Sequence, residues 1–180
     1  MIRRSVYGVC VCLLAACASG PFDEQSRFSS IPVGSELVLN QVIDIAPDQV
    51  AVHMQNGKLM EYSAMNHYQP HCKFEIYTMA ETPRQVQPDS FLITRVVDNM
   101  EMTSLRPSTM AGLMTALDGP DIVTYATYLY LSSAKQPDVF RMSCMHWEDI
   151  SVRRYLSISE MRRAMGERFS LQIKQPAAQT

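Results

Sequence analysis

The four histidines are the residues of this chain best suited to bind a metal ion or to move a proton. His67 and His71 are four residues apart, which places both side chains on one side of a continuous strand. His53 or His146 could supply a third ligand. However, Pro70 and the loop-like sequence around His67 interrupt such a strand. We therefore interpret the histidines as ordinary surface or strand-end residues and predict no metal site.

Methionine is abundant, with 13 residues in the chain, and thioether sulfur is a ligand that suits copper(I). One group contains Met142, Met145 and His146, and a second contains Met100 and Met102. In a strand, Met142 and Met145 would project to opposite faces. Core filling explains most of the methionines, because thioethers pack into irregular gaps. A periplasmic copper(I)-binding protein that uses methionine and histidine is kept as an alternative.

The sequence contains none of the common catalytic motifs. There is no Gly-x-Ser-x-Gly turn, no His-Glu-x-x-His sequence and no glycine-rich loop before a helix. The carboxylates that could do acid–base chemistry are scattered: Asp44, Asp48, Glu61, Glu75, Asp98, Glu148 and Asp149. A glycosidase needs two carboxyl groups about 5 to 9.5 Å apart, and the sequence pairs no two of these. We predict a non-catalytic protein without a cofactor, with a hydrolase of unrecognised site as an alternative.

A lipid attachment site is indicated at Cys17. The sequence Leu14-Ala15-Ala16-Cys17 follows a short apolar run and a basic start at Arg3 and Arg4. This stretch resembles the signal peptide and lipobox of bacterial lipoproteins. The resemblance implies that residues 1–16 are removed and that the sulfur of Cys17 carries diacylglycerol. The acylated terminus would then anchor the chain to a membrane.

An ordinary secretory signal or a transmembrane anchor is the alternative for residues 1–16. The apolar run from Ser5 to Ala16 is shorter than the ~20 residues that a membrane span needs, so an anchored protein is favoured. Gram-negative lipoproteins that stay at the inner membrane tend to have Asp after the cysteine, whereas this chain has Ala18. The resemblance therefore implies the periplasmic face of the outer membrane.

Cys72 and Cys144 are predicted to form a disulfide. Cys10 and Cys12 would leave with the signal peptide and Cys17 would carry lipid, so these two cysteines remain. Thiols in an oxidising periplasm usually pair. Each of the two also lies on the apolar side of a strand with alternating side chains, and both therefore point into the core. Two buried free thiols are the alternative.

Alternating hydrophobicity and turn residues predict about eight strands, and the candidate segments are nine: 36–40, 42–45, 50–55, 58–62, 72–79, 91–102, 122–132, 139–147 and 169–173. Asn56-Gly57 between two of them predicts a tight hairpin. Ser157 and Glu160 match the capping box of a short helix that ends at Gly166. The hairpin order predicts a mainly β fold, either an antiparallel β-sandwich or a small barrel, with a short C-terminal helix and a helical insert.

Composition agrees with one domain, because 47% of the 180 residues are hydrophobic. We assign a lipidated tether to residues 17–32, a single periplasmic domain to 33–174 and a disordered tail to 175–180. The domain is acidic and the C-terminal end basic, so no nucleic-acid partner is expected. In the predicted helix, Arg162 and Arg163 face away from the apolar side. We predict that they bind an anionic partner, with solvated arginines as the alternative.

The segment between Met102 and Ile122 is predicted to hold the helical insert, with Ser108 as its N-cap. Its apolar stripe recurs at helical spacing and consists of Met110, Leu113, Met114 and Leu117. The other side of the helix is small and uncharged, so we predict that the stripe binds a partner protein or the membrane surface. A lid docked permanently on the sheet is the alternative.

Together these features predict an outer-membrane-anchored periplasmic lipoprotein that serves as a non-catalytic accessory or assembly subunit of an envelope complex. Its partners would be the membrane, through the N-terminal lipid, and a protein of the envelope.

Overall fold

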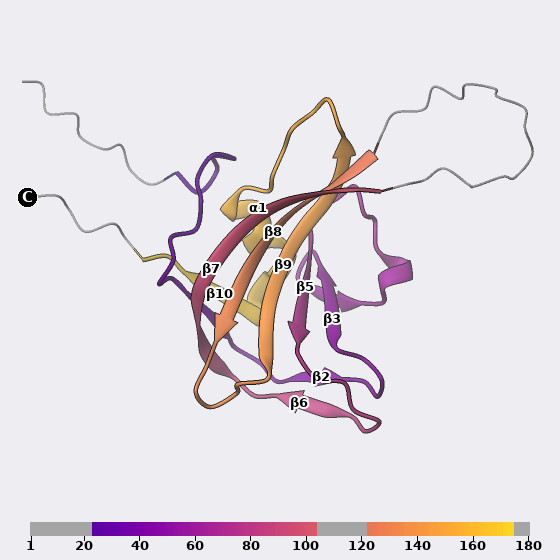
Figure 1. Ribbon diagram of the computed structural model, residues 1–180, viewed down its shortest axis with the longest axis vertical. Helices are drawn as coiled ribbons and strands as arrows, with labels where there is room; N and C mark the ends of the chain where they lie inside the picture. The colour runs from indigo at the N-terminus through magenta and orange to yellow at the C-terminus, as the bar shows by residue number, and fades with distance from the viewer. Residues whose placement is uncertain (1–22, 104–121, 175–180) are drawn as a thin grey trace, which may run out of the picture.

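The computed structural model describes residues 23–103 and 122–174, and these residues form mainly β-strands around one helix (Figure 1). The elements are β1 (Glu36–Leu39), β2 (Ile43–Ile45), β3 (Ala51–Gln55), β4 (Lys58–Met60), η1 (Tyr62–Ala64), β5 (His71–Ile76), β6 (Arg84–Val86), β7 (Asp89–Met102), β8 (Ile122–Ser132), β9 (Val139–Asp149), α1 (Ile158–Met165), η2 (Gly166–Arg168) and β10 (Phe169–Gln172). The predicted mainly β class is confirmed. The predictions for Cys17, the insert and the tail lie outside the described residues.

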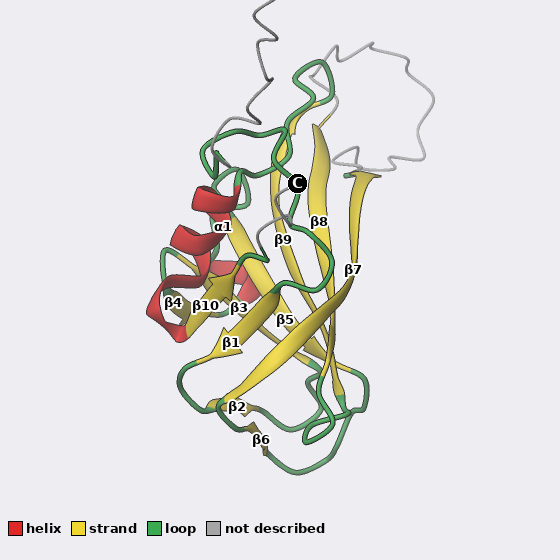
Figure 2. Cartoon of the chain, turned by 90° about the vertical axis from the view of Figure 1, so that its left-hand side faces the viewer, coloured by secondary structure: helices red, strands yellow, loops and turns green. Residues whose placement is uncertain are grey.

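The large sheet has eight strands in the order β10-β1-β7-β8-β9-β5-β3-β4, and its neighbouring strands are antiparallel. Strands β2 and β6 form a separate antiparallel pair. The long strands β7, β8 and β9 bend strongly, so the sheet curls into an open half-barrel (Figure 2). Of the two predicted architectures, the curled sheet is closer to a barrel than to a two-layer sandwich.

Helix α1 covers the inner face of the curled sheet. It lies behind β8 and β9 in Figure 1 and to one side of them in Figure 2. Its buried residues recur at helical spacing and are Ile158, Met161, Ala164 and Met165. They join a core that includes Cys72, Phe74, Met142 and Cys144 from β5 and β9. Each fully buried aliphatic, aromatic or methionine side chain contributes about 1.5–3 kcal/mol, so this face holds the fold together.

The helix starts and stops at the predicted residues. Ser157 accepts a hydrogen bond from the backbone N–H of Glu160, and the Glu160 carboxylate accepts one from the N–H of Ser157 at 2.9 Å. This reciprocal capping box satisfies two N–H groups that the first helical turn leaves without partners. Gly166 ends the helix with a φ of 62°.

The predicted hairpin between β3 and β4 turns at Asn56 and Gly57, which have φ values of 51° and 76°. The turn packs against the end of the helix, where the N–H of Gly57 donates to the carbonyl oxygen of Ala164 at 3.0 Å. A Cβ atom on Gly166 would lie 2.3 Å from the Cα of Gly57. The two glycines therefore allow an approach between turn and helix that larger residues would prevent.

Residues assigned to the tether already contact the domain. The carboxylate of Glu24 accepts two hydrogen bonds from the guanidinium of Arg162, at 2.8 and 2.9 Å. The carbonyl oxygen of Glu24 accepts a hydrogen bond from the N–H of Ser159 at 3.1 Å. Ile31 is buried in the core. The N-terminal segment is thus attached to helix α1 before the first strand begins.

Candidate functional site

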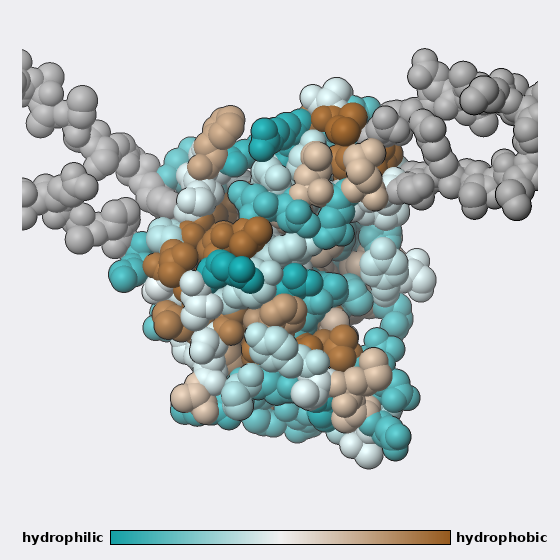
Figure 3. All heavy atoms as spheres, in the orientation of Figure 1, coloured by the Kyte–Doolittle hydropathy of each residue, from teal (hydrophilic) through white to brown (hydrophobic). Residues whose placement is uncertain are grey.

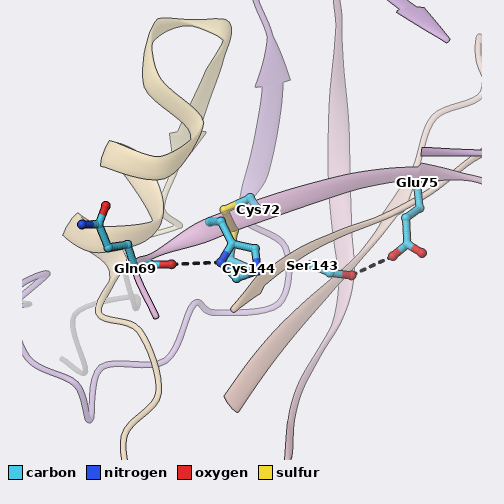
Figure 4. Close-up of a disulfide and its surroundings, with 6 residues drawn as sticks. Gln69, Cys72, Glu75, Ser143 and Cys144 are labelled. Atoms are coloured by element: carbon cyan, nitrogen blue, oxygen red, sulfur yellow. Dashed lines mark hydrogen bonds between the residues drawn. A yellow bond between two sulfur atoms is a disulfide. The ribbon is translucent and has the colours of Figure 1, made fainter. Parts of the chain in front are cut away.

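The disulfide between Cys72 and Cys144 forms as predicted and links the central strands β5 and β9 (Figure 4). The two residues are direct cross-strand partners with their Cα atoms 4.1 Å apart, and both are fully buried on the inner face. Side chains alternate along a strand. The residues between the inward-facing positions of β5 and β9 therefore share the outer face of the sheet.

Glu75 is a nearly buried carboxylate on this outer face, with 8% of its surface exposed. It accepts hydrogen bonds from Arg141 Nε at 2.6 Å and Ser143 Oγ at 2.8 Å, and Lys73 Nζ lies at 2.9 Å. Burial raises the pKa of Glu75, but the hydrogen bonds from Arg141, Lys73 and Ser143 outweigh that effect and lower it. Glu75 is therefore an ionised group that holds Arg141 in one position.

Aromatic rings lie against the arginine that pairs with Glu75, and a second arginine stacks on a ring of the same face. The guanidinium of Arg141 lies 4.3 Å from the ring centre of Tyr128 and 4.9 Å from that of Phe140. Arg95 stacks on Tyr130 at 3.8 Å. These are cation–π distances, so each arginine is held by a ring, and Arg141 is held by its ion pair with Glu75 as well.

Two ring contacts extend this arrangement to the end of β5. Phe140 lies 4.5 Å from Tyr77 and 5.6 Å from Tyr130, measured between ring centres. We call the whole surface the arginine–tyrosine face, and it consists of Tyr77, Arg95, Tyr128, Tyr130, Phe140 and Arg141. Figure 3 looks onto the outer side of the sheet, where hydrophilic residues are interspersed with small hydrophobic patches. Such a mixed, convex surface suits contact with another macromolecule better than enclosure of a small substrate.

Three histidines gather farther along the outer face, beside the loop that contains η1. Tyr62 lies between His53 and His67, with ring centres 5.4 and 4.6 Å away. His67 stacks on Trp147 at 4.6 Å and meets His71 at 5.3 Å. From the sequence, His67 and His71 would share one side only on a continuous strand, which Pro70 and the loop-like residues around His67 were predicted to interrupt. In the structure, His67 belongs to a loop that folds back over β5 and β9.

This loop is held by buried polar groups. The Gln55 side chain donates to the carbonyl oxygen of Asn66 at 2.8 Å and accepts from its N–H at 3.1 Å. Nδ1 of His71 lies 2.9 Å from the carbonyl oxygen of Gln69, the contact drawn beside Gln69 in Figure 4. Burial lowers the pKa of His71 and favours its neutral form. Among residues 23–103 and 122–174, no three His, Cys, Asp or Glu side chains are placed to hold one metal ion.

The fourth histidine lies apart from this group. His146 is on the inner face with 1% of its surface exposed, and neither ring nitrogen has a hydrogen-bond partner. Burial, with a smaller contribution from nearby Arg154, lowers the pKa of His146 to about 4. Met142 lies on the inner face. Met145 pairs with His71 in the β5–β9 ladder, next to the inward-facing Cys144, and therefore lies on the outer face. The methionine and histidine set considered for copper(I) is thus divided between two faces.

The scattered carboxylates remain separate, and several bind their own neighbours. Asp44 accepts from Gln85 at 2.8 Å, and Asp98 accepts from Thr127 at 2.7 Å. Glu148 is 3.7 Å from Arg154, and Asp149 accepts from Ser151. The groups named as acid–base candidates are therefore spread over the fold.

The predicted partner-binding residues differ in their surroundings. Arg162 is engaged by Glu24, whereas Arg163 is exposed. The stripe formed by Met110, Leu113, Met114 and Leu117 lies outside the described residues, so its role stays a prediction. Sequence reasoning missed the arginine–tyrosine face. The signal that could have found it is the disulfide itself, because pairing Cys72 with Cys144 in antiparallel strands places Glu75 opposite Arg141.

No protein-family model matches the chain, and no curated protein or solved structure matches it either. Within the described part of the chain, no helix has both the length and the apolar character needed to cross a membrane.

Proposed function

We propose that this protein is a lipid-anchored, non-catalytic subunit of an envelope complex on the periplasmic face of the outer membrane. It binds a protein partner through the arginine–tyrosine face. The lipobox-like sequence ending at Cys17 supports the anchor. The disulfide supports an oxidising compartment, because such bonds persist in exported proteins and are rare in the cytosol.

The observation that carries the binding proposal is the fixed position of the arginines and rings on the outer face. Tyrosine, tryptophan and arginine dominate the energetics of protein interfaces. Binding is weakened when flexible side chains must be ordered. Here Glu75 and the aromatic rings hold Arg141 in place, and Tyr130 holds Arg95. A partner would therefore meet a surface that is already ordered.

The binding proposal can be tested by site-specific photocrosslinking in intact cells. Tyr77 is 60% exposed and belongs to the arginine–tyrosine face, whereas Val33 is 57% exposed and does not. A photoreactive phenylalanine analogue at position 77 is expected to yield a discrete adduct with one envelope protein. The Arg95→Glu variant should lose that adduct while remaining folded. Equal adducts from positions 77 and 33, or none from either, would contradict the proposal.

The anchor is tested separately by mass spectrometry of the membrane-extracted protein. We expect an acylated cysteine at the N-terminus and no residues 1–16. The Cys17→Ser variant should leave the membrane fraction or accumulate unprocessed. A mature protein that starts elsewhere and carries no lipid would show that this part of the proposal is wrong.

A further inference from the structure

One end of the molecule combines the first described residues with exposed hydrophobic side chains. The N-terminal segment and the loop that follows β9 lie at the same end in both Figure 1 and Figure 2. This end carries Phe28, which is 98% exposed, and Ile150 and Val152, which are 42% and 46% exposed. Figure 3 shows hydrophobic residues at this end in separate spots, with hydrophilic residues between them. Burial of a fully exposed phenylalanine would contribute about 2 kcal/mol, so exposed hydrophobic residues at this end indicate that another molecule covers them.

The loop that carries Phe28 is held in a fixed shape. The carbonyl oxygen of Asp23 accepts hydrogen bonds from the N–H of Ser26 at 3.2 Å and from the hydroxyl of Ser29 at 2.6 Å. The paired Glu24 and Arg162 attach the start of the loop to helix α1. Phe28 is therefore presented outward by a loop that is itself attached to the domain.

The Phe28 loop is also next to the segment that leads from β9 into the helix. Residues 27–31 line a hollow of about 50 Å³ together with Tyr155 and Leu156. Ile150, Val152 and Arg153 precede Tyr155 in the same connection between β9 and α1, so the exposed groups at this end lie on two segments that meet at the hollow. We call this surface the docking end, and it consists of Arg27, Phe28, Ile150, Val152 and Arg153.

The length of chain before the domain indicates what this surface faces. Asp23 is six residues after Cys17, and a fully extended chain of six residues spans at most about 22 Å. Since the ion pair between Glu24 and Arg162 fixes the segment that follows, the lipid would emerge within this distance of Asp23, at the end of the molecule that carries the docking end.

We infer that the docking end rests on the lipid leaflet that holds the acyl chains of Cys17, with Phe28, Ile150 and Val152 entering the interfacial region. This inference rests on the proposed lipid anchor and adds a fixed orientation to it. Arg27 and Arg153 are exposed beside these residues and can contact lipid phosphates, each for about 1 kcal/mol near an anionic surface. The nearby carboxylate of Asp149 is turned to the N–H and hydroxyl of Ser151. The arginine–tyrosine face would remain open to a protein partner.

The orientation can be measured by fluorescence quenching on the full-length mature protein. The protein would be reconstituted in phosphatidylethanolamine–phosphatidylglycerol vesicles, with or without brominated acyl chains. The Phe28→Trp variant is expected to show blue-shifted emission and to lose most of its added fluorescence when the lipids are brominated. The matched control is Tyr77→Trp on the arginine–tyrosine face, whose added fluorescence should be unchanged. The parent protein, which contains the single Trp147, supplies the baseline for both.

A second variant tests whether the exposed residues act together. An Ile150→Trp probe should be quenched by brominated lipid, and Phe28→Ser in the same chain should reduce that quenching. Phe28 is almost fully exposed and Ile150 is 42% exposed, so both changes are made outside the core. Absence of quenching at Phe28→Trp, or equal quenching at Phe28→Trp and Tyr77→Trp, would overturn the inference.

The same vesicle experiment separates the docking inference from the anchor. If Cys17 is acylated but Phe28→Trp is not quenched, the anchor stands and the fixed orientation is wrong. If Cys17 is not acylated, quenching of Phe28→Trp in added vesicles would support docking by the surface alone. Loss of quenching in that unacylated protein would overturn docking as well as the anchor.

Discussion

The inner and outer faces of β5 and β9 differ sharply, although the same strands supply both. Cys72 and Cys144 point inward, are fully buried and join the core beneath helix α1. The residues next to them include Lys73 and Ser143, which point outward to Glu75. One face is thus closed by apolar packing and a covalent bond, while the other holds ordered charges and rings. The inner face therefore supplies most of the stability, and the outer face is the one that we propose for recognition.

Among the changes considered, removal of the disulfide should reduce the free energy of unfolding the most. The bond closes a loop of 72 residues, and its loss is expected to cost up to about 4 kcal/mol in the chain-entropy model. We expect the Cys72→Ala, Cys144→Ala double variant to unfold at a much lower urea concentration than the oxidised protein. Reduced wild-type protein is the control and should behave similarly. Equal midpoints for oxidised and reduced protein would show that the bond is energetically unimportant.

Acid should weaken the inner face through His146. Its folded-state pKa of about 4 lies below the ordinary 6.5, so between these pH values the imidazole is protonated in the unfolded chain and neutral in the folded chain. The contribution of His146 to the free energy of unfolding is therefore fully present above about pH 6.5. It is lost as the pH falls towards 4, and the loss amounts to about 3 kcal/mol.

The His146→Leu variant should flatten this part of the stability-versus-pH curve in urea titrations. Because both ring nitrogens lack partners, the change removes no hydrogen bond. His53→Leu serves as a control at a less buried histidine whose pKa is also lowered by burial. An unchanged slope in His146→Leu would show that another group causes the acid sensitivity.

Neutralising Glu75 tests how far the outer face contributes to stability. Glu75→Gln removes the charge that compensates Arg141 and Lys73, and partial solvent access limits the expected cost to about 2 kcal/mol. The exposed Glu81 supplies the matched Glu→Gln control, which should change stability little. A loss at Glu75 as large as that from the missing disulfide would argue against the division between the faces.

The smallest effect on stability is expected at Arg95. Its stacking on Tyr130 is exposed to solvent, so Arg95→Ala should cost less than about 1 kcal/mol. The same variant should lose the partner adduct at position 77. Thermal unfolding and crosslinking of one protein preparation measure both effects. A large loss of stability with unchanged crosslinking would reverse the roles assigned to the two faces.

The features that sequence analysis predicted are those with local signals. Asn56-Gly57 requires positive φ at two adjacent residues, and Ser157 with Glu160 forms a reciprocal cap within one helical turn. Alternation along each strand was enough to place Cys72 and Cys144 in the core. These signals also support the mainly β class, while the curvature that distinguishes a half-barrel from a sandwich depends on how all the strands pack together.

The candidate surfaces depend on contacts that no local pattern contains. Arg162 was predicted to bind an anionic partner, but in the structure it binds the carboxylate of Glu24, which is 138 residues away in the sequence. The ring contacts of His67 depend on a loop folding over β9. Glu75 and Arg141 become neighbours only when the strand register is known. In antiparallel strands, each residue after Cys72 pairs with a residue equally far before Cys144. The predicted disulfide therefore implied this register, although we did not derive it from the sequence.

If the chain is exported as proposed, the disulfide also has a consequence for oxidative folding. If residues 1–16 are removed, the chain retains three sulfhydryl groups, at Cys17, Cys72 and Cys144. Three thiols allow three different pairings, and two of them would include Cys17. A thioether bond to lipid takes the sulfur of Cys17 out of thiol–disulfide exchange. Acylation before oxidation would therefore leave a single possible pairing, and the chain could acquire its native bond without a disulfide isomerase.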